Sequence, residues 1–330
     1  MMTVSTASPN FTRTIDQSED AGTRSTINAP FGSALVQVAS ERTDIVGLTA
    51  DLGKYTDIFP FRDAFPERFF NIGMAEQNLI AVAAGLARTG YTPFATTYGV
   101  FASRRAYDFI AIACAHAGMD VKIIAGLPGL TTGYGGTHQA IEDLAIMTAV
   151  PGLVVVDPCD AIEIAAATRK IAEYRGAVYM RLLRGSVPVV LDSNYEFEIG
   201  KARQLRAGKD IGFVSTGMMT ERTLDAADAL AAQGVQAGVL HVSTLKPFDA
   251  DTVASFCSEV GSVISVENHV VRGGLASLVA EALFDRRVDK QLTRVGLADR
   301  FVECGSVATL QRRSGLTAPQ LVATAMEVLR

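Results

Sequence analysis

Tryptophan is absent from this sequence, cysteine is scarce, and lysine and arginine form no long tract. The four cysteines (Cys114, Cys159, Cys257 and Cys304) are widely spaced and form no Cys-x-x-Cys pair. This spacing argues against a zinc site and against a disulfide framework, and it fits a reducing cytoplasm. Because the net charge is −5 and no basic tract is present, nucleic acid and anionic membranes are poor candidates for partners.

Long apolar runs are also missing, because Gly, Pro and charged residues interrupt each of them, so no membrane-spanning helix is expected. The N-terminus lacks the basic and apolar regions of a secretory signal. The composition is that of a globular protein: 330 residues, 48% hydrophobic and 20% charged, enough for two domains and a large core. Residues 1–26, rich in Ser, Thr, Asp and Gly, are predicted to be a mostly disordered tail.

From Ile27 onward, short apolar segments rich in β-branched residues alternate with helical patterns. Such alternation is typical of parallel sheets that are covered by helices on both faces. The rhythm breaks once, after residue 190, and then restarts. The sequence therefore predicts an α/β protein of two domains, each a mostly parallel sheet covered by helices, with a first domain at 27–190, a linker at 191–205 and a second domain at 206–330.

The segment RFFNIGMAEQNLIAVAAGLARTG (residues 68–90) places one acid, Glu76, ahead of a helix that is apolar on nearly every side. An acid in the first turn can be explained by the helix dipole alone. A helix that is apolar all round is, however, expected to be buried, and a buried carboxylate needs a partner. A buried acid is also suited to exchanging a proton with a heterocyclic nitrogen. Glu76 is therefore a candidate catalytic residue.

Two further segments carry candidate binding residues. Tyr98, Phe101 and Arg104 are spaced by three at the turn from a strand into a helix, which places them on one face. The two aromatic residues either pack in the core, with Arg104 in solvent, or form a platform for a flat ring with a cation beside it.

The glycine-rich segment GLTTGYGGTHQ can approach a ligand closely and leads to His138. A lone histidine is more often structural, so His138 carries little weight by itself.

Taken in order, seven motifs resemble the C-terminal half of a transketolase, from about residue 24 to the end of the chain. They are TADLGKYT, FFNIGMAEQN, YGVFASRRAYD, GYGGTHQAIEDLA, VVDPCDA, YMRLLRG and GLADRF. The chain is also similar to the corresponding half of deoxyxylulose-phosphate synthase, and more distantly to the beta subunits of 2-oxoacid dehydrogenases. The resemblance implies a pyrimidine-binding domain and a transketolase C-terminal domain, thiamine diphosphate as cofactor, and transfer of a two-carbon ketol unit between a ketose and an aldose. It also implies that the C-terminal domain lies away from the chemistry.

The resemblance assigns cofactor-binding roles to five residues. Glu76 matches the glutamate that holds N1′ of the cofactor's aminopyrimidine ring and so promotes loss of the C2 proton. Tyr98, Phe101 and Arg104 match positions that flank this ring, with Phe101 as the stacking residue. Asp51, in TADL, matches an acid near the cofactor at the subunit interface.

Other matches concern the substrate. His138 matches a histidine that contacts the substrate at the reacting carbon, and Arg184 matches an arginine that grips the sugar phosphate. Tyr134 replaces the acid that reads the donor hydroxyl in transketolases, while Gly126 and Tyr55 fall where a phosphate-binding histidine and serine are found. The acceptor pocket is therefore rebuilt, and an unusual or branched sugar phosphate, such as apulose phosphate, is a reasonable expectation.

The GDG…N motif, which binds Mg²⁺ and the diphosphate in the first half of a transketolase, is missing from this sequence. No metal site is predicted in the chain, because Mg²⁺ with a diphosphate needs such a site of oxygen ligands. The resemblance thus implies a separate large subunit that carries the motif, in an α2β2 assembly.

Two alternatives stay open. One is the beta subunit of a 2-oxoacid dehydrogenase-type enzyme, although THQ and RAYD favour a transketolase. The other is a non-catalytic paralogue with a structural role, although the retention of Glu76, Phe101 and His138 argues against it.

Overall fold

A computed structural model describes residues 24–330 of the chain. Most of the predicted tail falls on residues 1–23, outside the described residues. The last three residues assigned to the tail are part of the fold, because β1 (Thr26–Asn28) pairs with β8 (Ser186–Pro188) in an antiparallel ribbon. Arg24 also forms ion pairs with Glu221 and Asp225.

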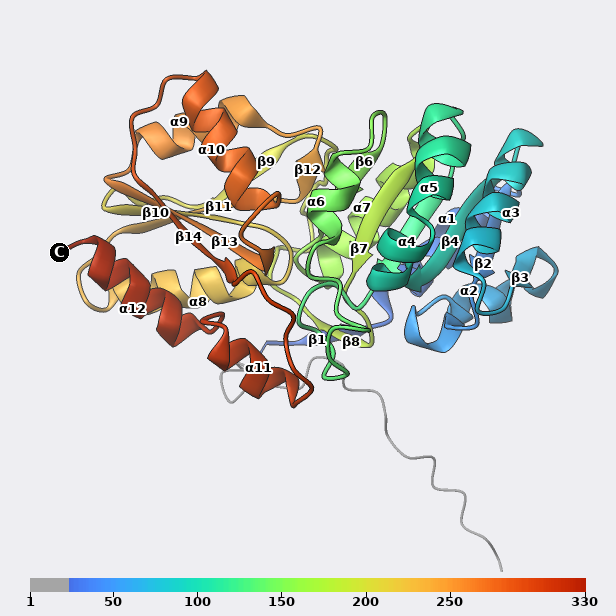
Figure 1. Ribbon diagram of the computed structural model, residues 1–330, viewed down its shortest axis with the longest axis horizontal. Helices are drawn as coiled ribbons and strands as arrows, with labels where there is room; N and C mark the ends of the chain where they lie inside the picture. The colour runs from blue at the N-terminus through green and yellow to red at the C-terminus, as the bar shows by residue number, and fades with distance from the viewer. Residues whose placement is uncertain (1–23) are drawn as a thin grey trace, which may run out of the picture.

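Two sheets lie side by side, each with helices packed against it (Figure 1). The first has seven strands in the order β12-β6-β7-β5-β4-β2-β3, all parallel except β12, and the second has five in the order β14-β13-β10-β11-β9, all parallel except β9. The predicted α/β class with two sheet-centred domains is therefore confirmed. The strands are β2 (Ile45–Thr49), β3 (Phe69–Asn71), β4 (Thr92–Tyr98), β5 (Lys122–Gly126), β6 (Val154–Val156), β7 (Val178–Leu182), β9 (Ala202–Arg206), β10 (Ile211–Ser215), β11 (Ala237–Val242), β12 (Thr244–Lys246), β13 (Ser262–Val270) and β14 (Leu292–Leu297).

The helices cover both sheets and leave the central strands fully buried. In the first domain α1 packs against α7, and in the second α8 packs against α12. The helices are α1 (Pro30–Glu41), α2 (Phe59–Ala64), α3 (Glu76–Arg88), α4 (Gly99–Arg105), α5 (Tyr107–Phe109), α6 (Asp143–Thr148), α7 (Ala161–Glu173), α8 (Met219–Ala231), α9 (Ala250–Ser258), α10 (Leu275–Asp285), α11 (Val307–Arg313) and α12 (Ala318–Val328).

The predicted linker at 191–205 differs from the structure at its end. Its last four residues belong to β9, which adds an antiparallel edge to the second sheet beside β11. Only Ala202 of β9 is fully buried, because edge strands need only one buried face, and the sequence ARQLR therefore lacks the apolar run that marks a central strand.

One strand crosses the boundary between the domains. Residues of β12 come from the second half of the chain, yet they pair with β6 at the edge of the first sheet. Lys246 of β12 also donates from Nζ to the carbonyl oxygen of Thr148 at 2.9 Å. The two domains are thus joined by backbone pairing as well as by side chains.

The predicted single helix at 101–118 consists of three consecutive pieces. After α4, Ala106 leaves helical geometry (φ −106°, ψ 9°), and α5 follows it. A π-helical stretch, Ile110–His116, completes the segment. Of the predicted site residues, Phe101 and Arg104 lie in α4, and Tyr98 is the residue before it.

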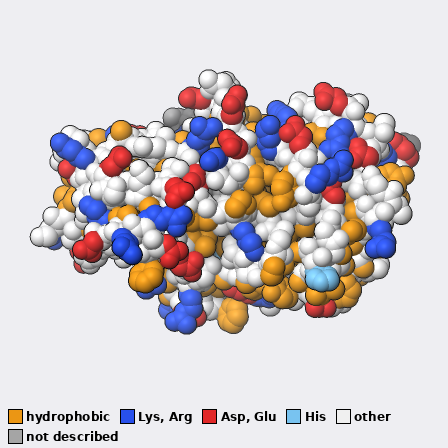
Figure 2. Space-filling view, turned by 90° about the horizontal axis from the view of Figure 1, so that it is seen from above, with side chains coloured by type: hydrophobic (Ala, Val, Ile, Leu, Met, Phe, Trp, Pro, Cys, Tyr) orange, Lys and Arg blue, Asp and Glu red, His pale blue; other side chains and the backbone are white. Residues whose placement is uncertain are grey.

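The surface carries charged side chains of both signs around apolar areas on the face seen in Figure 2. Within residues 24–330, no helix is long and apolar enough to cross a membrane. The four cysteines are free thiols, three of them buried and Cys304 exposed.

Candidate functional site

The candidate residues gather where the parallel strands of the first sheet end. Tyr98 ends β4, the glycine-rich loop follows β5, Arg184 follows β7 and Asp51 follows β2. In open parallel sheets, ligands bind outside these carboxyl ends of the strands. The strand order therefore brings together residues that are up to 133 positions apart in the sequence.

Glu76 begins α3 and is only 4% exposed. Its Oε1 accepts a hydrogen bond from Nη1 of Arg105 at 3.1 Å. Its Oε2 has no hydrogen-bond partner among residues 24–330, and the side chain lines a hollow of about 540 Å³ together with Met74, Gln77, Arg104 and Arg105. The carboxylate is thus positioned to accept a hydrogen bond from a ligand.

The prediction that α3 is buried all round is wrong for this chain. Leu79, Ile80 and Ala83 pack inward, whereas Gln77 and Asn78 are exposed. The helix buries one stripe, as a helix on the outside of a sheet does. Glu76 is buried because it starts the helix beside α4, not because the helix is enclosed.

Arg105 is a site residue that the sequence analysis did not select. Its guanidinium lies 4.0 Å from the centre of the Phe101 ring while it donates to Glu76. A planar cation therefore makes the two contacts that a flat nitrogen heterocycle would make, stacking on Phe101 and hydrogen bonding to Glu76. This arrangement fits a flat nitrogen heterocycle such as an aminopyrimidine, which would take the place of the Arg105 side chain, 54% of which is exposed.

Arg104, which was predicted to flank the ring, points instead to the glycine-rich loop. It pairs with Glu142 and donates from Nη1 to the carbonyl oxygen of Gly136 at 2.8 Å. Its Cζ also lies 5.5 Å from the ring centre of Phe301, a residue of the second domain. Arg104 thus borders the hollow, but its bonds hold a loop.

An aromatic cluster surrounds His138. The centres of the Phe101 and Tyr134 rings lie 5.4 and 5.5 Å from the His138 ring, and that of Tyr98 lies 6.3 Å away. Nδ1 of His138 bonds the hydroxyl of Thr137 at 2.9 Å, whereas Nε2 has no partner within the described chain. The structure therefore brings four of the predicted residues to one place, with an imidazole nitrogen free for a ligand.

Arg184 lies beside this cluster. Its Cζ is 5.4 Å from the ring centre of Tyr55, and its buried Nε has no hydrogen-bond partner among residues 24–330. Burial raises the pKa of the neighbouring Tyr98 to about 12, an effect that the positive charge of Arg184 partly offsets. A buried guanidinium N–H without a partner fits an anionic ligand group.

Asp51 lies at the periphery of the site. It adopts a positive φ of 60°, and its carboxylate accepts from Nδ2 of Asn71 at 2.9 Å. Asn71 in turn accepts from the backbone N–H of Gly73 at 3.1 Å, in the turn that precedes α3. Asp51 is therefore connected to the start of the Glu76 helix through Asn71.

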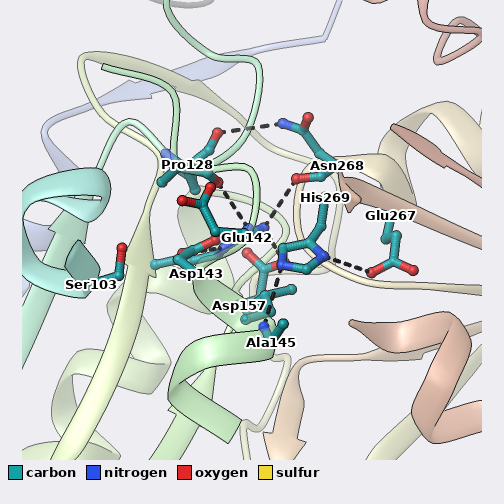
Figure 3. A network of polar contacts seen from close by, with 12 residues as sticks. Ser103, Pro128, Glu142, Asp143, Ala145, Asp157, Glu267, Asn268 and His269 are labelled. Atoms are coloured by element: carbon teal, nitrogen blue, oxygen red, sulfur yellow. Dashed lines mark hydrogen bonds and ion pairs between the residues drawn. The ribbon is translucent and has the colours of Figure 1, made fainter. Parts of the chain in front are cut away.

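The glycine-rich loop is held at its base by a buried network that joins the domains (Figure 3). Arg181 of β7 pairs with Asp143 at the start of α6 and donates from Nη1 to Asp157 at 3.3 Å. Burial raises the pKa of Asp157, whereas Arg181 outweighs burial at Asp143 and lowers the pKa of that carboxyl. Asn268 of the second domain accepts from the N–H of Leu130 at 2.9 Å.

His269 and Glu267 extend this network and carry unusual protonation states. Nε2 of His269 accepts from the N–H of Ala145 at 3.3 Å, and Nδ1 donates to the carbonyl of Val270, so the ring is neutral. Burial, helped by the charge of Arg181, lowers its pKa to about 4. Glu267 accepts from the N–H groups of Leu275 and Ala276, yet burial raises its pKa to about 7. Nδ1 of His269 lies 3.7 Å from Oε2 of Glu267. Because the imidazole is neutral, the two side chains do not form an ion pair at neutral pH.

These two shifts predict opposite pH dependences that nearly cancel. The lowered pKa of His269 makes the fold lose stability as pH falls from 6.5 to 4, while the raised pKa of Glu267 makes it lose stability as pH rises from 4.5 to 7. Glu267→Gln removes only the second effect. Relative to wild type, this variant should gain about 3 kcal/mol of unfolding free energy between pH 4.5 and 7.

Urea unfolding at several pH values measures this difference. Because the other titrating groups are common to both proteins, they cancel in the comparison. A difference between variant and wild type that stays constant across the range would show that Glu267 is ionised in the fold.

Two other features lie outside the candidate site. A hollow of about 770 Å³ between α1, α7 and residues 193–203 contains none of the predicted site residues. The buried side chains of Cys159, Glu163 and His241 could together offer metal ligands. However, Glu163 already accepts from Nε2 of His241 at 2.8 Å and from the hydroxyl of Tyr195 at 2.8 Å. This cluster acts as a hydrogen-bonded link between the domains.

Comparison with known families agrees with this arrangement. Residues 24–189 match the family described as "Transketolase, pyrimidine binding domain", and residues 200–321 match "Transketolase, C-terminal domain". A transketolase family protein of Sinorhizobium fredii is 51% identical over 304 residues, which cover 91% of this chain and 88% of the relative. The chain belongs to the transketolase family.

Two further matches are to proteins described as a transketolase subunit or as a split-gene transketolase. The 6-deoxy-6-sulfo-D-fructose transketolase subunit of a Clostridium species is 41% identical, over 89% of this chain and 91% of the relative. A solved structure described as a split-gene transketolase, inactive beta4 tetramer, is 41% identical with a TM-score of 0.85, and the match covers 92% of this chain and 98% of that one. The predicted likeness to split transketolase subunits is therefore confirmed.

Proposed function

We propose that this chain is the small subunit of a split transketolase, which transfers a two-carbon ketol unit from a ketose to an aldose in the cytoplasm. The observation that carries the proposal is the Glu76–Arg105–Phe101 arrangement, in which a planar cation occupies the place of a flat heterocycle. The match to split-gene and subunit relatives along nearly their whole length supports it.

Thiamine diphosphate, when bound, would supply the carbon that accepts the two-carbon unit and the electron sink for C–C cleavage. Glu76 would hold the pyrimidine by a hydrogen bond through its buried carboxylate, which already has one oxygen free. Phe101 would stack on the ring, and Tyr98 would pack against Phe101, whose ring centre lies 5.7 Å away. Asp51 and Arg104 would border the cofactor on either side of these contacts.

The substrate would lie against the aromatic cluster. His138 would contact the reacting carbon's oxygen through its free Nε2, and Tyr134 would line the donor end. Arg184, with its unpartnered Nε, would bind the anionic end of the sugar. A sugar phosphate fits this group, and the relative named for a sulfonated fructose indicates that a sulfonate is the other anion to test. A branched phosphate such as apulose phosphate belongs to the same panel.

We further propose that a separate large subunit, carrying the GDG…N motif, holds the diphosphate and Mg²⁺, and that two copies of each subunit assemble as α2β2. The sequence of this chain contains no GDG. The hollow beside Glu76 is open, and exposed apolar side chains lie near it, including Met74 at 79% exposure. Such a surface fits a partner that completes the cofactor site.

The test is to purify the tagged chain from its native cells with thiamine diphosphate and Mg²⁺ present and to identify the proteins that copurify. We expect a stoichiometric partner with a GDG…N motif, and a complex that moves two carbons from a ketose phosphate, sulfofructose or apulose phosphate to an aldose. A complex that instead releases CO₂ from a 2-oxoacid would identify a dehydrogenase-type subunit. A chain that copurifies with no partner and binds no cofactor would support the alternative of a non-catalytic paralogue with a structural role.

A further inference from the structure

The second domain reaches the candidate site through the segment 298–306, which joins β14 to α11. In Figure 1 this red segment runs beside the green glycine-rich loop that follows β5. The N–H of Gly305 donates to the carbonyl oxygen of Gly133 at 3.1 Å. This contact joins residues 172 positions apart, in different domains.

The two segments fit tightly against each other at residues 133–136 of the loop. A Cβ added at Gly133 would lie 2.1 Å from the carbonyl oxygen of Gly305, and one at Gly135 would lie 2.7 Å from Sγ of Cys304. A Cβ at Gly136 would lie 3.1 Å from the Phe301 ring. The glycines are therefore explained by close packing against 298–306, and not only by approach to a ligand.

Phe301 and Arg104 hold the tip of the loop. The Phe301 ring packs on Gly136, although the side chain is 73% exposed. Cζ of Arg104 lies 5.5 Å from the centre of that ring, and Nη1 of Arg104 donates to the carbonyl oxygen of Gly136 at 2.8 Å. Helix α4, the loop tip and the second domain thus meet at one point.

This contact bears directly on the position of His138. The N–H of His138 donates to the carbonyl of Gly135 at 2.9 Å, which closes a turn across Gly136 and Thr137. Two residues of that turn, Gly135 and Gly136, lie against Cys304 and Phe301. The loop base is held separately, because Gln311 of α11 donates to the carbonyl of Leu130 at 2.7 Å.

We propose that the C-terminal domain positions the substrate site: Phe301, with Arg104, fixes the glycine-rich loop and thereby the rings of His138 and Tyr134. Phe301 is a positioning residue, since it acts through its contacts with the loop backbone at Gly136 and with Arg104. Its kinetic consequence depends on the transketolase activity proposed above, whereas its effect on the loop does not.

The loop is tested first, by hydrogen exchange on the full chain, with or without its partner. Phe301→Ala should make the amides of residues 135–138 exchange about tenfold faster, while the amides of β4 and β5 keep their rates. Phe301→Tyr, which keeps the ring, should restore the wild-type rates. Phe284→Ala removes another exposed phenylalanine, on α10, and should leave the loop unchanged. Unchanged exchange of 135–138 in Phe301→Ala would overturn the proposal.

The kinetic test uses the assembled enzyme. Phe301→Ala should lower kcat/KM for the ketose by on the order of 10- to 100-fold, mainly through KM, because a small displacement of a positioned group is costly. Exchange of the cofactor's C2 proton should stay at the wild-type rate, because Glu76 lies on α3 and not on the loop. Phe301→Tyr should recover most of the loss.

Three outcomes separate the possibilities. Equal kcat/KM for Phe301→Ala and Phe284→Ala would overturn the positioning role, and so would equal loss in transfer and in C2-proton exchange, which indicates a general defect. If the wild-type complex transfers no two-carbon unit, the proposed function fails, and the hydrogen-exchange result alone decides whether Phe301 holds the loop.

Discussion

Glu76→Gln should lower the rate of two-carbon transfer by the assembled enzyme by about 10²- to 10⁴-fold. The amide keeps the shape of the side chain and can still accept the hydrogen bond from Arg105, so the fold should be preserved. It cannot carry the negative charge that a protonated ring nitrogen needs as its partner. Steady-state transfer with saturating thiamine diphosphate measures the loss, and C2-proton exchange should slow in parallel.

The matched control is Glu281→Gln, which changes an exposed glutamate of α10 in the same way. It should behave as wild type in both assays. Transfer by Glu76→Gln within about tenfold of the control would remove Glu76 from the chemistry, since a positioned acid or base contributes more than this. Loss of transfer with unchanged C2-proton exchange would place Glu76 in a later step.

Arg181→Met should lower the free energy of unfolding by about 3–5 kcal/mol, which is the range for breaking a buried ion pair. The variant leaves the carboxylate of Asp143 buried, and within the described part of the chain only the Tyr179 hydroxyl, at 2.8 Å, stays as a side-chain partner. Arg181 is itself 2% exposed and is satisfied by two carboxylates and two backbone carbonyls. Urea unfolding at pH 7 measures the loss.

The double variant Arg181→Met/Asp143→Asn distinguishes lost packing from an uncompensated charge. It removes the charge of Asp143 and keeps an acceptor for Tyr179, so it should recover much of the lost stability. Arg286→Met, which breaks an exposed pair with Asp251, should cost less than about 1 kcal/mol. A double variant no more stable than Arg181→Met alone would contradict the charge argument.

The periodicity of the sequence predicts the fold well where strands are central. Segments such as those of β5 and β7 are fully buried and largely apolar, with one buried cation each, because helices cover both of their faces, and such runs stand out. Edge elements carry a weaker signal. Both β9 and β14 have only one fully buried residue and include charged residues, so the sequence pattern does not distinguish them from linker and loop.

The candidate site was predicted in part, for a reason that lies in helix geometry. Phe101 has helical neighbours at both the third and the fourth following positions. The predicted spacing of three leads to Arg104, whereas the fourth-position neighbour, Arg105, lies on the Phe101 ring. The contact between Phe301 and the loop could not be predicted, because no local pattern records which residues of a distant segment fill the space beside a glycine.

The strand that passes from the second half of the chain to the first sheet also protects the molecule from self-association. Without β12, the edge strand β6 (VVV) would present unpaired backbone groups on a short, wholly apolar strand, a template for pairing with another chain. β12 covers that edge, and its Lys246 places a charge at the new margin of the sheet. A fragment ending in the linker would leave the β6 edge uncovered, so we expect it to self-associate more readily than the whole chain.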